Sequence, residues 1–167
     1  MHLNKLYYIN HLYQYYQDPL DPKKRYFDKK AIGFFYSKEE AEELIRQYKK
    51  LSGFRDYPEG FYIDEYTIDT IYNEQLAKLI QKSTPTMGVQ EILYSICYCY
   101  EEKEGDDEIE ILAFFSTEEK AQKALKLLME IPELKLIAEQ LDVYEENVHR
   151  KEWSEGFIKW SEASEEN

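Results

Sequence analysis

The sequence predicts an α+β fold in which two β-β-α-β modules pack as one pseudo-symmetric domain with a mainly antiparallel sheet. Residues 31–69 align with residues 111–149 at a constant offset of 80 and without a gap, which indicates an internal duplication. Each aligned stretch carries apolar residues at the spacings of a strand, a helix and a second strand, and a Tyr-rich strand precedes it. A single three-stranded module buries its sheet poorly, so the two modules are expected to share a core.

The first module is expected over residues 1–72. Its three strands are rich in Tyr, Phe and Ile, and they cover Leu3–Tyr15, Ala31–Tyr36 and Phe61–Ile68. The capping box Ser37-Lys-Glu-Glu40 predicts a helix start, because a Ser side chain accepts a hydrogen bond from the backbone N–H three residues on. Apolar residues at i, i+3, i+4 and i+7 form the buried stripe of this helix, and Gly53 is the C′ residue expected to end it.

The second module is expected over residues 91–150, after a linker of weak helix and loop over residues 73–90. Its three strands cover Leu93–Glu101, Ile109–Phe115 and Leu141–Val148. Ser116-Thr-Glu-Glu119 is the matching capping box. Pro132 interrupts the helix that follows, so a further short helix is expected over Glu133–Gln140.

The C-terminal segment, residues 151–167, is expected to form a short helix followed by an acidic tail. Trp153, Phe157 and Trp160 are spaced so that a helix would carry all three on one stripe. Such a stripe is expected to dock on its own domain. A contact with a second copy or with a partner is the alternative that this spacing leaves open.

Three motifs stand out along the chain: Gly33-Phe-Phe-Tyr-Ser-Lys-Glu-Glu-Ala41, Gly53-Phe-Arg-Asp-Tyr-Pro-Glu-Gly-Phe-Tyr-Ile-Asp-Glu-Tyr66 and Trp153-Ser-Glu-Gly-Phe157. Together they resemble a family of short acidic bacterial domains of unknown function. The resemblance covers most of the first module, whereas positions 132–140 of the second lack the glycines and the Tyr-Pro of the loop. It implies no known activity. Such domains resemble those found beside bacterial toxin and antitoxin-like genes, so the resemblance implies a binding or immunity role.

The charge of the chain limits the classes of partner. The 167 residues include 34 acidic and 21 basic side chains, a formal net charge of −13 at pH 7. Nucleic-acid binding through phosphate neutralisation and binding to anionic membranes both need clustered Lys and Arg, so neither is expected. Residues 1–83 carry 13 acidic and 13 basic side chains, so the excess of negative charge lies in residues 84–167.

The densest acidic segment spans residues 101–110, at the turn expected between the first two strands of the second module. The corresponding segment of the first module, Asp18–Lys30, carries five basic and three acidic residues. An acidic surface favours solubility, but solubility does not require the charge to be concentrated in one module. Electrostatic steering of a basic protein partner does require such a concentration. The candidate partner contacts are therefore seven acidic residues and a neighbouring tyrosine: Glu101, Glu102, Glu104, Asp106, Asp107, Glu108, Glu110 and Tyr100.

The loop Ser52–Gly60 adds two candidate contacts, Arg55 and Tyr57, because Arg and Tyr are favoured at binding hot spots. Phe54 and Phe61, in and beside the same loop, are expected to close the core instead.

The residues that could carry catalysis or bind a metal are sparse. Cys97 and Cys99 are expected to lie reduced on one strand face, since a structural zinc site usually needs four ligands and the three histidines are scattered. A nucleophilic cysteine needs a His base, and no spacing in the sequence indicates one. Glu65 and Glu145, which correspond in the two modules, are the most symmetric candidates for paired acids.

These observations favour a non-enzymatic bacterial protein that binds a basic partner, such as a toxin or nuclease, without a cofactor or a metal. A small-ligand sensor with a pocket between the modules and a metal-dependent enzyme using acidic residues are the alternatives, and a homodimer stays open. No signal peptide and no apolar stretch of membrane-spanning length is recognised, so a cytoplasmic location is expected.

Overall fold

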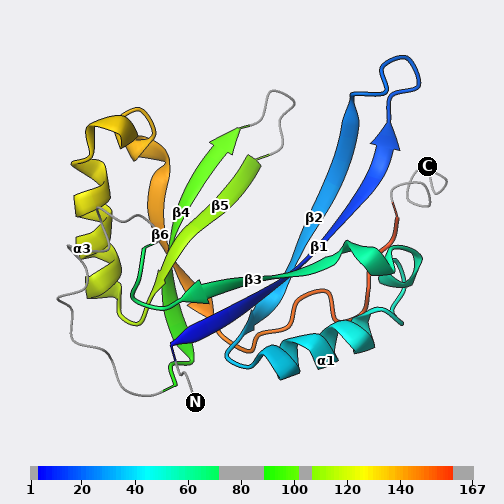
Figure 1. Cartoon of the computed structure of the whole chain (residues 1–167), viewed down its shortest axis with the longest axis horizontal. Helices are drawn as coiled ribbons and strands as arrows, with labels where there is room; N and C mark the ends of the chain where they lie inside the picture. The colour runs from blue at the N-terminus through cyan, green and yellow to red at the C-terminus, as the bar shows by residue number, and fades with distance from the viewer. Residues whose placement is uncertain (1–3, 72–88, 102–106, 160–167) are drawn as a thin grey trace. The chain divides into compact units, whose positions relative to one another are not determined.

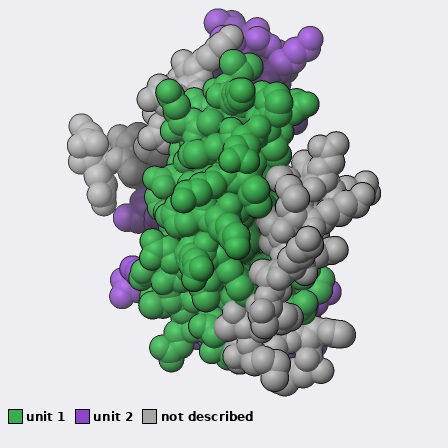
Figure 2. Space-filling model, turned by 90° about the vertical axis from the view of Figure 1, so that its left-hand side faces the viewer, with its two compact units in different colours: residues 1–6, 66–148 green, residues 7–65, 149–167 purple. Residues whose placement is uncertain are grey.

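The computed structural model describes residues 4–71, 89–101 and 107–159, and the chain divides into two compact units (Figures 1 and 2). Unit 1 comprises residues 1–6 and 66–148, coloured green in Figure 2. Unit 2 comprises residues 7–65 and 149–167, coloured purple. Among these described residues the architecture is α+β, with a three-stranded antiparallel sheet and a helix of about three turns in each unit.

The sheet of unit 2 has the strand order β2-β1-β3, formed by β1 (Lys5–Gln17), β2 (Arg25–Phe35) and β3 (Phe61–Thr67). β1 and β2 pair in antiparallel fashion out to Gln17↔Arg25, so this hairpin is longer than the sequence predicted. Cross-strand pairs such as Tyr16↔Tyr26 continue the ladder beyond the predicted strand ends, because β-propensity depends on the cross-strand neighbour as well as on the residue itself.

Helix α1 (Lys38–Tyr48) starts where the sequence predicts it, since the Ser37 hydroxyl accepts a hydrogen bond from the Glu40 backbone N–H at 3.2 Å. The prediction that Gly53 ends this helix is wrong, because α1 stops at Tyr48 and Lys49 is its C-cap. Gly53 has φ 82° and precedes a 3₁₀ turn, η1 (Phe54–Asp56). A second turn, η2 (Pro58–Gly60), leads into β3.

Unit 2 has its own apolar core between the sheet and α1. It is rich in aromatic side chains. Phe54 is one of its buried members and Phe61 packs at its edge, as expected from the sequence. The buried members are Ile9, Tyr13, Ile32, Phe35, Ala41, Leu44, Tyr48, Phe54 and Phe157.

The sheet of unit 1 has the strand order β5-β4-β6, formed by β4 (Ile92–Glu101), β5 (Asp107–Phe115) and β6 (Leu141–Asn147). Its central strand has an irregularity between Ile96 and Cys97 in the pairing with β5, and β1 has one between Ile9 and Asn10 in the pairing with β2. The two sheets therefore have the same layout, with the middle strand first in chain order in each.

Helix α3 (Glu118–Met129) lies on one face of this sheet (Figure 1). Its N-cap is Thr117, whose hydroxyl accepts from the Lys120 N–H at 3.3 Å, one residue later than the capping box predicted. Ser116 is instead buried and bonded to Asp69. The predicted helix over Glu133–Gln140 is replaced by two 3₁₀ turns, η3 (Pro132–Leu134) and η4 (Ala138–Gln140).

The core of unit 1 lies between α3 and the sheet. Tyr94 and Tyr98 pack against it from β4, so the middle of this Tyr-rich strand is covered on the helix side. The buried members are Ile71, Ile96, Ala113, Phe115, Ala121, Ala124, Leu125, Leu128 and Leu141.

The units do not coincide with the expected modules 1–72 and 91–150, because the chain changes unit near the end of β3 and again just after β6. Residues 66–71 belong to unit 1, and residues 149–159 belong to unit 2. The Asp69 N–H donates to the Phe114 carbonyl in unit 1, and the His149 N–H donates to the Phe34 carbonyl in unit 2, both at 2.8 Å. Asp69 and His149 both have positive φ, of 61° and 64°.

The C-terminal helix expected from residue 151 is absent over residues 151–159, and the rest of residues 151–167 lies outside the described range. Trp153 has φ 57° and Gly156 has φ 83°, values that a right-handed helix does not contain. The expected linker over residues 73–90 lies outside the described residues except for its last two positions.

Candidate functional site

The acidic segment lies at the end of the β4–β5 hairpin of unit 1. Antiparallel pairing continues to the last described residues, Glu101↔Asp107, with Tyr100↔Glu108 next to them. The strands therefore fix the backbone up to the two residues, Glu101 and Asp107, that flank positions 102–106. Glu102, Glu104 and Asp106 lie outside the described residues.

Below the turn, the hairpin has an aromatic and an apolar feature beside its charge. The Tyr98 and Tyr100 rings stack with centroids 4.9 Å apart, and both are half-buried. Exposed Glu110 pairs with Tyr98, so its side chain lies on the same face as the two rings. Ile109 pairs with Cys99 on the other face and is 55% exposed. We refer to residues 98–110 as the acidic hairpin.

The negative charge remains segregated when it is divided by unit. Unit 1 contains 18 acidic and 8 basic side chains, a net charge of −10. Unit 2 contains 16 acidic and 13 basic side chains, a net charge of −3. The corresponding hairpin of unit 2, between β1 and β2, exposes Lys23, Lys24, Arg25 and Lys29.

Arg55 and Tyr57 belong to unit 2, whereas the acidic hairpin belongs to unit 1. Arg55 lies in η1 and is exposed. Tyr57 is half-buried, with its ring centroid 4.6 Å from that of Tyr13. Its carbonyl accepts a hydrogen bond from His11 Nε2 at 2.8 Å. Tyr57 therefore contributes to the interior of unit 2 as well as being a candidate partner contact.

The two cysteines lie on β4 as free thiols. Burial raises the pKa of the Cys97 thiol to about 11, and its closest polar neighbour is the Ser95 hydroxyl at 3.3 Å. That hydroxyl donates to Glu146 at 2.7 Å, and burial raises the pKa of the Glu146 carboxyl. The hydrogen bond with Cys99 raises the pKa of Tyr144 to about 12. Because the thiolate is the reactive form of cysteine, Cys97 is a poor nucleophile at neutral pH.

Glu65 and Glu145 are both exposed, and they belong to different units. Within the described ranges, no group of three or more His, Cys, Asp and Glu side chains is arranged to hold a metal ion.

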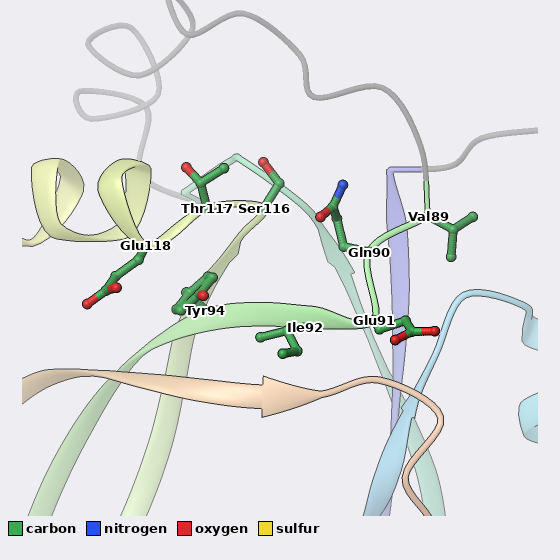
Figure 3. A pocket seen from close by; sticks show the side chains of 8 residues that line it. All are labelled: Val89, Gln90, Glu91, Ile92, Tyr94, Ser116, Thr117 and Glu118. Carbon is green, nitrogen blue, oxygen red and sulfur yellow. The ribbon is translucent and has the colours of Figure 1, made fainter.

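A shallow pocket of about 390 Å³ lies in unit 1 at the start of α3. Figure 3 shows Tyr94 and Ile92 of β4 on one side of it and Ser116 and Thr117 on the other. The Ser116 hydroxyl donates to Asp69, and the Thr117 hydroxyl accepts from the helix. Both hydroxyls therefore already have partners within the protein.

Unit 2 contains a cluster that the sequence did not indicate, centred on Lys30, which is only 6% exposed. The ammonium lies 4.4, 4.6 and 5.5 Å from the ring centroids of Phe157, Trp153 and Tyr13, and it pairs with the Asp28 carboxylate. Rings at these distances attract a cation through their quadrupoles. Two of these rings come from the Trp153-Ser-Glu-Gly-Phe157 motif, whose spacing predicts a helix and gives no sign of a contact with Lys30.

Comparison with known proteins places only the first part of the chain. Residues 4–76 match the family model described as a domain of unknown function, DUF7336. No curated protein and no solved structure showed a significant match to the chain. Among the described residues, no helix has the length and apolar character needed to cross a membrane.

Proposed function

We propose that this protein is a non-enzymatic protein-binding module of the immunity or inhibitor type, and that its acidic hairpin binds a basic protein partner. The observation that carries the proposal is the charge of −10 on unit 1, with its densest acidic segment at the end of a β-hairpin. Such a charge accelerates encounter with a basic surface at low salt.

The acidic hairpin combines charge with features that supply affinity. Surface ion pairs alone are each worth about 1 kcal/mol or less, so a stable complex also needs apolar or aromatic contact. The Tyr98–Tyr100 stack provides an aromatic contact on the face of Glu110, and exposed Ile109 provides an apolar contact on the opposite face. Tyr100 is therefore the expected anchor, with the carboxylates as the polar rim.

Two further proposals accompany this function. We propose that the two halves of the chain are divergent copies, supported by the matching strand orders and by the pair Asp69 and His149 at the offset of 80. We also propose a cytoplasmic location, supported by the two free thiols, because disulfides are rare in reducing compartments.

Capture from the native lysate at low salt tests the function. Three baits are compared: the wild type, a hairpin variant and a control variant with the same change of charge. The hairpin variant carries Glu102→Gln, Glu104→Gln, Asp106→Asn and Glu110→Gln. The control variant carries Glu130→Gln, Glu133→Gln, Glu139→Gln and Glu145→Gln, all at exposed positions of unit 1.

The wild type and the control variant are expected to retain the same basic protein, identified by mass spectrometry. The hairpin variant is expected to retain about tenfold less of it, because encounter and rim contacts both weaken. Capture of no basic protein, or equal losses from the two variants, would contradict the proposal.

A small-ligand sensor is the second candidate, and the pocket beside Tyr94 and Ser116 supports it. A rise in melting temperature with members of a metabolite panel, abolished by Tyr94→Ala, would favour this candidate over protein binding.

A further inference from the structure

The segment after β6, residues 149–159, completes unit 2 although it belongs to the second half of the chain. We call it closing segment C. Its backbone donates to that of unit 2 at three points: from His149 to Phe34, from Glu152 to Ile32 and from Phe157 to Ser52, at 2.8 to 2.9 Å. The Tyr48 hydroxyl in turn donates to the Glu152 carbonyl at 2.7 Å.

Closing segment C also contributes side chains to the interior. Phe157 is 7% exposed and belongs to the core of unit 2, with its ring centroid 4.8 Å from that of Phe54. Trp153 and Phe157 form two of the three aromatic walls around Lys30. Lys159 pairs with Asp56 at 3.0 Å.

The receiving surface is shaped for close backbone approach. A Cβ atom on Gly33 would collide with the Arg150 carbonyl, and one on Gly53 with Phe157. A Cβ atom on Gly156 would collide with the Ser52 carbonyl, and Gly156 has a φ of 83° that disfavours any side chain. Gly33 and Gly53, in the first half of the chain, thus leave room for backbone and side-chain atoms of residues 150–157, which belong to the second half.

Unit 1 receives a segment from the first half in the same manner. Residues 66–71, which we call closing segment N, comprise the last two residues of β3 and the four residues that follow it. The Tyr66 ring packs on that of Phe114 with centroids 4.8 Å apart, and Ile71 is buried in the core. Asp69 accepts from the Ser116 N–H at 2.8 Å and from Lys120 Nζ at 3.0 Å.

We infer that the two halves of this chain are each other's binding partners, each closing the unit that the other half builds. Unit 2 receives a turn-containing segment with the pattern aromatic-x-x-Gly-Phe, and unit 1 receives a segment whose Asp accepts hydrogen bonds at the start of α3. A covalent link between the halves is therefore not needed to hold them together. The domain of residues 4–76 is complete only with a segment donated from outside it.

Cleavage of the full chain between its halves tests this inference. A protease site is inserted after Pro85 in a Trp160→Phe background, which leaves Trp153 as the only tryptophan. The folded protein is cut, and the association of the halves is measured by size-exclusion chromatography over a dilution series, with Trp153 emission as the reporter of closing segment C.

The cut halves of the parent protein are expected to co-elute and to keep a native Trp153 emission. Phe157→Ala is expected to raise the dissociation constant of the cut halves by about 100-fold, the scale of deleting a buried Phe side chain. Asp69→Ala is also expected to weaken the association of the cut halves, because it removes the hydrogen bonds of closing segment N to Ser116 and Lys120 in unit 1. Lys151→Ala, at an exposed position of closing segment C, is the control and leaves it unchanged.

Separation of the parent halves after cutting would overturn the inference. So would halves that stay together equally well in the Phe157→Ala, Asp69→Ala and Lys151→Ala proteins. If Phe157→Ala prevents folding of the uncut chain, Trp153→Ala replaces it and association is followed by size-exclusion chromatography alone, because Trp153 is 45% exposed and forms only one wall of the Lys30 cluster.

Discussion

At the scale of single residues, Lys30 shows how a buried cation is accommodated by rings and one carboxylate. Its partner Asp28 is 26% exposed, and three aromatic rings surround the ammonium on its other sides. Removing one member of a buried ion pair leaves the other uncompensated, which costs more than the pair itself contributes. Lys29, the preceding residue on β2, is exposed and provides a matched control.

Lys30→Met is expected to lower the free energy of unfolding of unit 2 by about 2 kcal/mol, because a desolvated cation–π contact and an ion pair are lost together. Lys29→Met is expected to change it by less than about 0.5 kcal/mol. Urea denaturation in the Trp160→Phe background, followed by Trp153 emission, measures both changes in the free energy of unfolding. Equal effects of the two substitutions would contradict this account of the cluster.

His11 makes the stability of unit 2 depend on pH. Its Nε2 donates to the Tyr57 carbonyl, and its Nδ1 is buried without a partner among the described residues. Burial lowers the pKa of His11, so the unfolded chain takes up the proton at higher pH than the folded protein does. The resulting stability is complete above the unfolded pKa, near 6.5, and is lost as pH falls from there through the lowered folded pKa.

Acidification below pH 6.5 is therefore expected to destabilise unit 2 with a limiting slope of about 1.4 kcal/mol per pH unit from this one proton. His11→Gln keeps an N–H donor for the Tyr57 carbonyl and removes the titration. It should flatten that part of the slope in urea denaturation monitored by Trp153 emission. An unchanged slope in this variant would assign the pH dependence to other groups.

At the scale of elements, local patterns predicted the strands and helices well, and tertiary pairing decided their ends. The stripe of α1 and the Ser37 cap depend on residues three or four apart, so they can be read from sequence. The length of the β1–β2 hairpin depends on cross-strand pairs such as Tyr16↔Tyr26, which no local window contains. The N-cap of α3 is Thr117 and not Ser116, because the Ser116 N–H donates a hydrogen bond to Asp69, which is distant in sequence.

Ser37→Ala is expected to cost about 1 kcal/mol, since it removes the acceptor for the Glu40 N–H at the start of α1. Ser154→Ala, at an exposed position, is expected to be neutral. Chemical denaturation with Trp153 emission separates the two. A neutral Ser37→Ala would show that water replaces the cap without loss.

At the scale of the whole molecule, the net charge of −13 is unevenly shared by the two units. Unit 1 carries −10 and unit 2 carries −3, so electrostatic self-repulsion is larger in unit 1. Salt shortens the range of this repulsion, because the Debye length falls from about 30 Å at 0.01 M to about 3 Å at 1 M.

Raising the NaCl concentration from about 0.02 to about 0.5 M is expected to stabilise unit 1 more than unit 2, because screening removes more repulsion there. Both tryptophans belong to unit 2, so their emission reports that unit, whereas far-UV circular dichroism reports both. The midpoint by dichroism is expected to rise more than the midpoint by emission. A larger shift of the midpoint by emission than of the midpoint by dichroism would indicate that electrostatic repulsion is stronger in unit 2.

The sequence by itself determined the α+β class, the mainly antiparallel pairing, the start of α1 and the location of the acidic segment, because each depends on composition or on neighbours a few residues apart, whereas the division into two sheets came from the structure. The tertiary structure alone decided which segments complete which unit. Closing segment C and the Lys30 cluster join residues more than a hundred positions apart, through backbone approach at Gly53 and Gly156 and a cation among rings. Contacts of that range leave no periodic pattern, so the spacing of Trp153 and Phe157 predicts a helix where the structure has an irregular segment with turns.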